Sequence, residues 1–175
     1  MGARRIGRER ALQALYQMEM SALRPEDALE TAWNAEPEGP PDPEAQRFAL
    51  ELVQGVVQHR AEIDGLIEQH SHNWRLDRMA RVDRNVLRLA VFELKWRPDI
   101  PKKVTLNEAV ELGKAFGTEA SSAFVNGLPG YPDPPLLRRA APPGPSVQGA
   151  RRRNRASAWL LALTRGPARQ GLSGR

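Results

Sequence analysis

The sequence predicts an all-α domain of about seven helices, followed by an irregular C-terminal tail. Apolar residues recur at the three- and four-residue spacing of helix faces up to residue 127. No stretch shows the alternation of apolar and polar residues that marks a half-buried strand. The tail holds eight of the fifteen prolines, a composition that favours disorder. We therefore predict a helical domain at residues 1–127 and a separate tail at residues 128–175.

The first half of the domain reads as three helices. Residues 4–20 carry an apolar stripe, and Pro25 fits the first turn of a helix over residues 24–35. A proline-rich linker follows, and residues 44–70 then show one long helical pattern. Gly55 inside this pattern either permits the close approach of another helix or lies on the surface without a role.

The central helix is predicted over residues 82–96, which are apolar on nearly every side. Such a helix is buried among several neighbours rather than laid on a surface. Pro98 and Pro101 end it, since proline cannot continue the hydrogen-bond ladder. A further helix is expected over residues 102–116, and a last one opens near Thr118.

The net charge of +5 hides an uneven distribution. The tail contains nine arginines and one acid and contributes +8, so the first 127 residues carry 5 − 8 = −3. The absence of cysteine excludes a disulfide framework and a thiolate metal site. No apolar run reaches the roughly 20 residues of a membrane span, and the N-terminus lacks the apolar segment of a secretory signal. We expect a cytoplasmic protein without membrane contact.

Four arginines, Arg4, Arg5, Arg8 and Arg10, cluster near the start of the first helix. The helix dipole disfavours positive charge at this end, so the cluster needs a reason such as a phosphate partner. A solvated helix end without a role is the alternative. Because the rest of the domain is mildly acidic, a local basic patch is a more informative sign of nucleic-acid binding than the high isoelectric point.

Recognition of single-stranded RNA combines cations with aromatic faces on which unstacked bases lie. Tyr16 and Phe124 are the candidate aromatics, although each is equally compatible with packing in the core. Lys114 is a further candidate cation, with a solvated helix face as the alternative. His70 and His72 have no third metal ligand nearby, and no nucleophile stands with a base and an orienting group. We predict RNA binding without catalysis, metal or cofactor.

Two stretches carry a more specific signal. They are RRIGRERALQALYQME near the N-terminus and VDRNVLRLAVFELKWRPDIPKKVTLNEAVELGKAFGTE with FVNG after it. Both resemble the NusB family of transcription antitermination factors. The resemblance implies two small three-helix bundles packed crosswise. It also implies binding of boxA-type single-stranded RNA from ribosomal RNA transcripts, together with the small-subunit ribosomal protein NusE, in an antitermination complex of RNA polymerase.

The resemblance also implies roles for individual residues. In this family the arginine-rich N-terminal segment contacts RNA, and the segment TEASSAF helps to line the same site. Glu119 matches an acidic position there, while Ala120 stands where many relatives have a second acid. Asp83 matches an acidic position at the contact with NusE, and its alternative is a residue that complements the helix dipole.

Two other classes of function stay open. Related domains precede an RNA cytosine methyltransferase, which would make the chain an enzyme module; the missing cysteines and the absent cofactor-binding domain argue against it. A bundle that binds only proteins is the third possibility. It predicts that charge reversal at the N-terminal arginines leaves RNA binding unchanged.

The tail departs from the family. Pro129 and Gly130 stop the last helix at once. We interpret the tail as the product of a shifted reading frame, because removal of one base from the Pro129 codon can encode Leu-Leu-Asp, which resembles the expected continuation. A genuine basic tail that adds salt-sensitive RNA affinity is the alternative.

Overall fold

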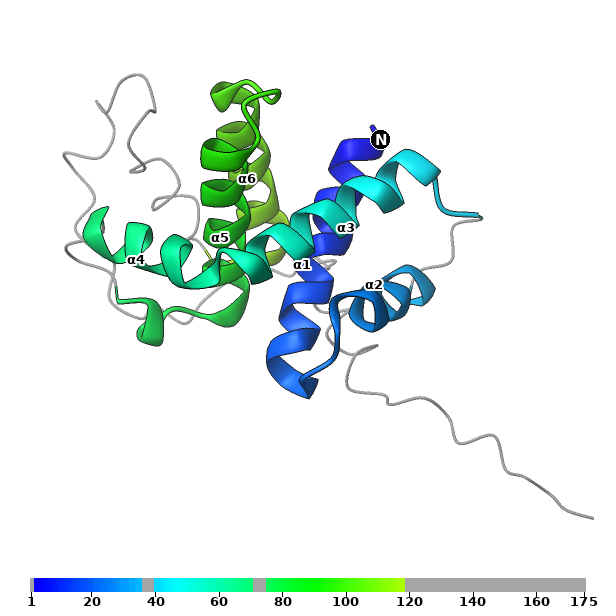
Figure 1. The fold of residues 1–175 in the computed structure, drawn as a ribbon, viewed down its shortest axis with the longest axis horizontal. Coiled ribbons are helices and arrows are strands. Elements are labelled where there is room, and N and C mark those ends of the chain that lie inside the picture. The colour runs from blue at the N-terminus through cyan, green and yellow to red at the C-terminus, as the bar shows by residue number, and fades with distance from the viewer. Residues whose placement is uncertain (1, 36–39, 71–74, 119–175) are drawn as a thin grey trace, which may run out of the picture.

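The computed structural model describes residues 2–35, 40–70 and 75–118. Within them the protein has six α-helices and one short 3-10 helix, η1 (Figure 1). Their bounds are α1 Ala3–Ser21, α2 Pro25–Asn34, α3 Pro43–Gln58, α4 Arg60–His70, η1 Leu76–Arg78, α5 Arg81–Trp96 and α6 Lys102–Phe116. The predicted all-α fold is confirmed for this part of the chain.

Four predicted helices agree with α1, α2, α5 and α6 to within one residue at each end. The prediction of a single helix over residues 44–70 is wrong, because the chain bends at His59 between α3 and α4. His59 has φ −102° and ψ 14°, which interrupts the regular helix. Both α3 and α4 contact α5.

The helices form two groups that cross at α5. Helices α1, α2 and α3 pack against one another around Leu12, Leu29 and Leu52, each at most 5% exposed. Helix α5 packs against α4 and α6, and it is also contacted by α1 and α3. Figure 1 shows α3 running across α5, so the two bundles meet crosswise as the resemblance implied. None of the described helices is long and apolar enough to cross a membrane.

Helix α5 is buried on nearly all sides, as its composition predicted. Val86, Leu87 and Leu89 are each at most 1% exposed. Phe92 packs directly on Gly55 of α3, where an added Cβ would lie 2.0 Å from the nearest ring carbon. Of the two roles open for Gly55, close helix approach is therefore confirmed.

The far end of α1 is joined to α5 by an ion-pair network around Glu19. Its carboxylate accepts hydrogen bonds from Arg84 at 2.7 Å and from Arg88 at 2.5 Å. Arg60 and Arg81 lie 3.9 Å from the same carboxylate. Burial alone would raise the pKa of Glu19, but the hydrogen bonds and charges of Arg84 and Arg88 outweigh it and hold the pKa below the usual value.

A prediction for acid stability follows from the lowered pKa of Glu19. Stabilisation by a carboxylate whose folded pKa is depressed is complete above its unfolded pKa, 4.5 here, and is lost as the pH falls through the folded pKa. Replacing Glu19 with glutamine is expected to lower the melting temperature at pH 7 and to flatten its decline between about pH 5 and pH 3. Thermal melts over this range check it, and parallel declines for both proteins would contradict it.

The predicted tail at residues 128–175 lies outside the described residues, as do the predicted site residues Glu119 and Phe124.

Candidate nucleic-acid interface

The first turn of α1 lies beside the turn that joins α5 to α6. Arg4 and Arg5 lie in the first turn of α1, and 49% and 41% of their side chains are exposed. Helix α1 starts after Gly2 with no side-chain cap and no acid in its first turn. A groove with a volume of about 350 Å³ opens at this place. Its lining consists of Gly2, Arg4, Arg5, Arg8, Ile100, Pro101, Val104 and Glu108.

Arg5 forms a bidentate ion pair with Glu108 of α6. Its Nε donates to Oε2 at 2.9 Å and its Nη2 donates to Oε1 at 2.8 Å. The hydrogen bond to Glu108 and the charge of that carboxylate raise the pKa of Arg5 above its ordinary value. The side chain therefore stays charged and is fixed in direction, while 41% of it faces solvent.

Arg8 is buried rather than offered to solvent. Its Nε and Nη2 donate to the two carboxylate oxygens of Glu93 at 2.8 and 2.7 Å. The Arg8 side chain is 4% exposed and that of Glu93 is 2% exposed. Thr105 of α6 also donates to Glu93 at 3.2 Å. The guanidinium of Arg8 is thus occupied by a buried partner, so this arginine joins α1 to α5.

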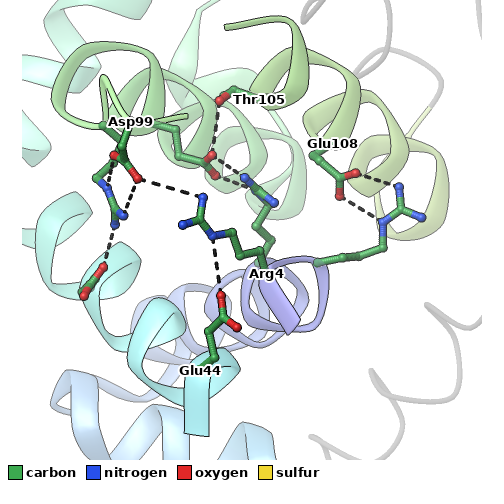
Figure 2. Close-up of polar contacts among 10 residues, drawn as sticks. Arg4, Glu44, Asp99, Thr105 and Glu108 are labelled. Atoms are coloured by element: carbon green, nitrogen blue, oxygen red, sulfur yellow. Dashed lines mark hydrogen bonds and ion pairs between the residues drawn. The ribbon is translucent and has the colours of Figure 1, made fainter. Parts of the chain in front are cut away.

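Arg4 has looser partners. Its guanidinium lies 3.8 Å from a carboxylate oxygen of Glu44 and 4.0 Å from one of Asp99 (Figure 2). Asp99 is also held by Arg97, whose Nε and Nη2 donate to it at 2.9 and 3.0 Å. Because ion pairs of this length at an exposed site contribute little, Arg4 is the cation of the groove that is least engaged by the protein.

The other predicted contacts lie away from the rim of the groove. Arg10 is 8% exposed, donates to Gln13 at 2.9 Å and lies over the ring of Trp33. Tyr16 is half-buried and packs against the core. Lys114 is 60% exposed and pairs with Glu111. The structure thus brings together Arg4, Arg5 and Arg8, and only the first two reach solvent.

Asp83, the predicted contact for a protein partner, is 7% exposed. Its two carboxylate oxygens accept hydrogen bonds from the backbone N–H of Thr118 at 2.9 Å and from the Thr118 hydroxyl at 2.7 Å. Asp83 therefore fixes the chain where it leaves α6.

The acids around these arginines are the part of the site that the sequence analysis missed. Glu44 comes from α3, Glu93 from α5, Asp99 from the following turn and Glu108 from α6. Figure 2 shows how these carboxylates face α1 from several elements. The predicted basic patch is therefore close to charge balance. Only Glu93 gave a signal in the sequence, as an acid within a helix that is apolar on nearly every side.

Sequence similarity places this arrangement among known proteins. The sequence profile of the NusB family matches residues 5–128. The chain belongs to the NusB family. A NusB family member of Myxococcus xanthus, called transcription antitermination protein NusB, is 70% identical over 129 residues, which cover 73% of this chain and 92% of that protein. The protein of the same name from Geobacter sulfurreducens is 52% identical over 129 residues, covering 73% and 91%.

Solved NusB structures share the fold. A NusB structure from T. maritima has a TM-score of 0.63 at 38% identity, covering 73% of this chain and 87% of that one. A crystal structure of the antitermination factors NusB and NusE in complex with double-stranded RNA gives a TM-score of 0.64 at 30% identity, covering 73% and 92%. The two-bundle architecture is thus that of the NusB family.

Proposed function

We propose that the chain is a non-enzymatic transcription antitermination factor. It binds boxA-type RNA of ribosomal RNA transcripts together with the ribosomal protein NusE, as part of an antitermination complex of RNA polymerase in the cytoplasm. The membership of the NusB family supports this function, as does the solved complex of a relative with NusE and RNA. The family match ends at residue 128, which supports the boundary proposed between the RNA-binding domain and the tail.

The observation that carries the proposal is the placement of Arg4 and Arg5. Both side chains are partly exposed to solvent at one groove, although acids lie close by. Arginine forks bind phosphate oxygens through paired N–H groups, and such contacts fix nucleic acid on a protein. The buried Arg8 enters the proposal as a support for this helix end. Lys114, Tyr16, Glu119 and Phe124 are proposed as further RNA contacts, of which Glu119 and Phe124 lie outside the described residues.

Replacing both Arg4 and Arg5 with glutamine tests the proposal. Binding of boxA-type RNA is expected to weaken by about 30-fold or more, because two charge-assisted contacts of about 1 kcal/mol or more each are lost. The salt dependence should also become shallower, by about 0.7 in the logarithmic slope for each lost phosphate contact on a single strand. Titrations of labelled RNA at two salt concentrations, with and without NusE, measure both quantities.

The matched control is Arg47→Gln, which changes an exposed arginine of α3 outside the groove lining. This change removes one positive charge elsewhere and is expected to leave boxA binding nearly unchanged. If net charge alone drives binding, the control, which removes one charge instead of two, would lose about half as much binding free energy as the double variant. Unchanged binding in the double variant would favour a bundle that binds only proteins.

A further inference from the structure

The ion pair between Arg5 and Glu108 uses only one edge of the guanidinium. The two donors are Nε and Nη2, which form the side-on edge. The end-on edge, formed by Nη1 and the second hydrogen of Nη2, donates to no acceptor within the described residues. A guanidinium carries five N–H donors in a fixed plane, so a second acceptor with two oxygens fits on this edge without breaking the first pair.

The side chain of Glu108 is held more firmly by the protein than that of Arg5. Its side chain is 19% exposed, against 41% for Arg5, and it stands in the second turn of α6. Helix α6 packs against α5, and its residues Leu106 and Ala109, on either side of Glu108 in sequence, are buried in the core at 1% and 3% exposure. The Glu108 carboxylate is therefore held in place by a packed helix. Its two hydrogen bonds restrict the long and rotatable side chain of Arg5.

Arg4 provides an internal comparison. Its nearest carboxylate oxygens lie at 3.8 and 4.0 Å and its guanidinium lies over the ring of Phe48, so within the described part of the chain no hydrogen bond sets its orientation. The two exposed arginines of the groove thus differ in kind. Arg4 supplies positive charge that adapts to its partner, whereas Arg5 has one edge fixed by the protein and the other edge open.

We propose that Glu108 is a positioning residue for RNA binding, which holds Arg5 so that its end-on edge forms a preformed fork for one backbone phosphate. The inference rests on the function proposed above and deepens it. A fork that is already oriented loses less conformational freedom on binding, and the planar edge matches two phosphate oxygens. The guanidinium then stands between two anions, with Glu108 behind it and the phosphate in front.

The substitution Glu108→Gln tests the proposal, because a positioning role and a pure charge effect predict opposite changes in RNA affinity. Removing a negative charge from the groove tightens RNA binding if only net charge matters. If Glu108 positions Arg5, binding weakens instead, by about three- to tenfold, because a neutral amide cannot accept both guanidinium hydrogen bonds. The readout is the dissociation constant of labelled boxA-type RNA with the full-length chain at two salt concentrations.

Glu111→Gln is the matched control. Glu111 lies on the same helix, is 51% exposed and pairs with Lys114, and its charge acts on Arg5 without a hydrogen bond to it. The control makes the same change in net charge near Arg5 and is expected to leave RNA binding unchanged or slightly tighter. Thermal melts of both variants exclude a loss caused by unfolding.

A double-mutant cycle shows whether Glu108 acts through Arg5. In an Arg5→Gln background, Glu108→Gln is expected to cause no further loss of RNA binding, because the fork is already gone and only the repulsion by the carboxylate is removed. An equal loss in both backgrounds would mean a structural role, and tighter binding of the single variant would mean that Glu108 only competes with RNA; either result overturns the proposal. If Arg5→Gln itself leaves binding unchanged, the proposed function at this groove fails as well, so the two failures are distinguishable.

Discussion

Replacing Glu93 with glutamine is expected to lower the free energy of unfolding by about 3–5 kcal/mol, because it leaves the Arg8 guanidinium buried without its counter-charge. Both side chains are at most 4% exposed, and two hydrogen bonds of 2.8 and 2.7 Å join them. Thr105 loses its bond to the carboxylate as well. Urea denaturation followed by circular dichroism measures the loss as a lower midpoint at an unchanged slope.

Two controls isolate the buried charge. Glu62→Gln removes an acid from the exposed pair with Lys95 and is expected to cost less than about 1 kcal/mol. The double substitution Arg8→Met with Glu93→Met removes both charges together and is expected to recover most of the stability, since well-packed apolar side chains replace buried ion pairs at little cost. A small loss for Glu93→Gln would contradict the structural role assigned to the pair.

The recovered double variant also decides the role of Arg8 in RNA binding. If Arg8 acts only by holding α1 on α5, a folded protein with methionine at both positions keeps its affinity for boxA-type RNA. If Arg8 leaves Glu93 to meet a phosphate, the affinity falls although the fold is intact.

Replacing Gly55 with alanine is expected to be the second large effect, with a loss of about 1–3 kcal/mol from overpacking against Phe92. The added Cβ would meet three carbons of the ring at 2.0, 2.3 and 2.7 Å. Alanine favours a helix over glycine by about 1 kcal/mol, so the measured loss is the clash minus this gain. Thermal and urea unfolding measure it.

Gly65→Ala is the control, because Gly65 lies in α4 and an added Cβ there meets nothing within 4 Å. This change is expected to stabilise the protein by about 0.5–1 kcal/mol, through helix propensity alone. Shortening Phe92 to leucine should cost less in the Gly55→Ala background than in the wild type, since it relieves the clash. Equal behaviour of the two glycine variants would show that α3 does not pack closely on α5.

Most of the helices could be predicted from local patterns of apolar residues and prolines. The apolar residues of α5 predicted a central buried helix, and its flanking prolines marked its end. The bend at His59 was not predicted from the sequence, because the residues on both sides of it keep a helical pattern. The contacts of α3 and α4 with α5 exist only in the assembled bundles, so they leave no local pattern in the sequence.

The candidate site was predicted in part. The clustered arginines indicated a basic end of α1, and two of them do reach solvent. Which arginine would be buried depended on acids 85 and 103 residues further along the chain, at Glu93 and Glu108. Spacing along one helix cannot report partners at such separations. Arg8 was therefore indistinguishable from Arg4 and Arg5 before the helices were placed.

The long sequence separation of these ion pairs has a consequence for protein synthesis. Arg5 precedes Glu108 by 103 residues and Arg8 precedes Glu93 by 85, so both arginines leave the ribosome well before their acids are made. At about 5–20 residues per second, the N-terminal helix waits for several seconds before its acids arrive. Until then Arg5 and Arg8 lack these two acids. The groove is thus completed only after α6 is made, and the first helix of the nascent chain lacks two of the acids that face it in the folded protein.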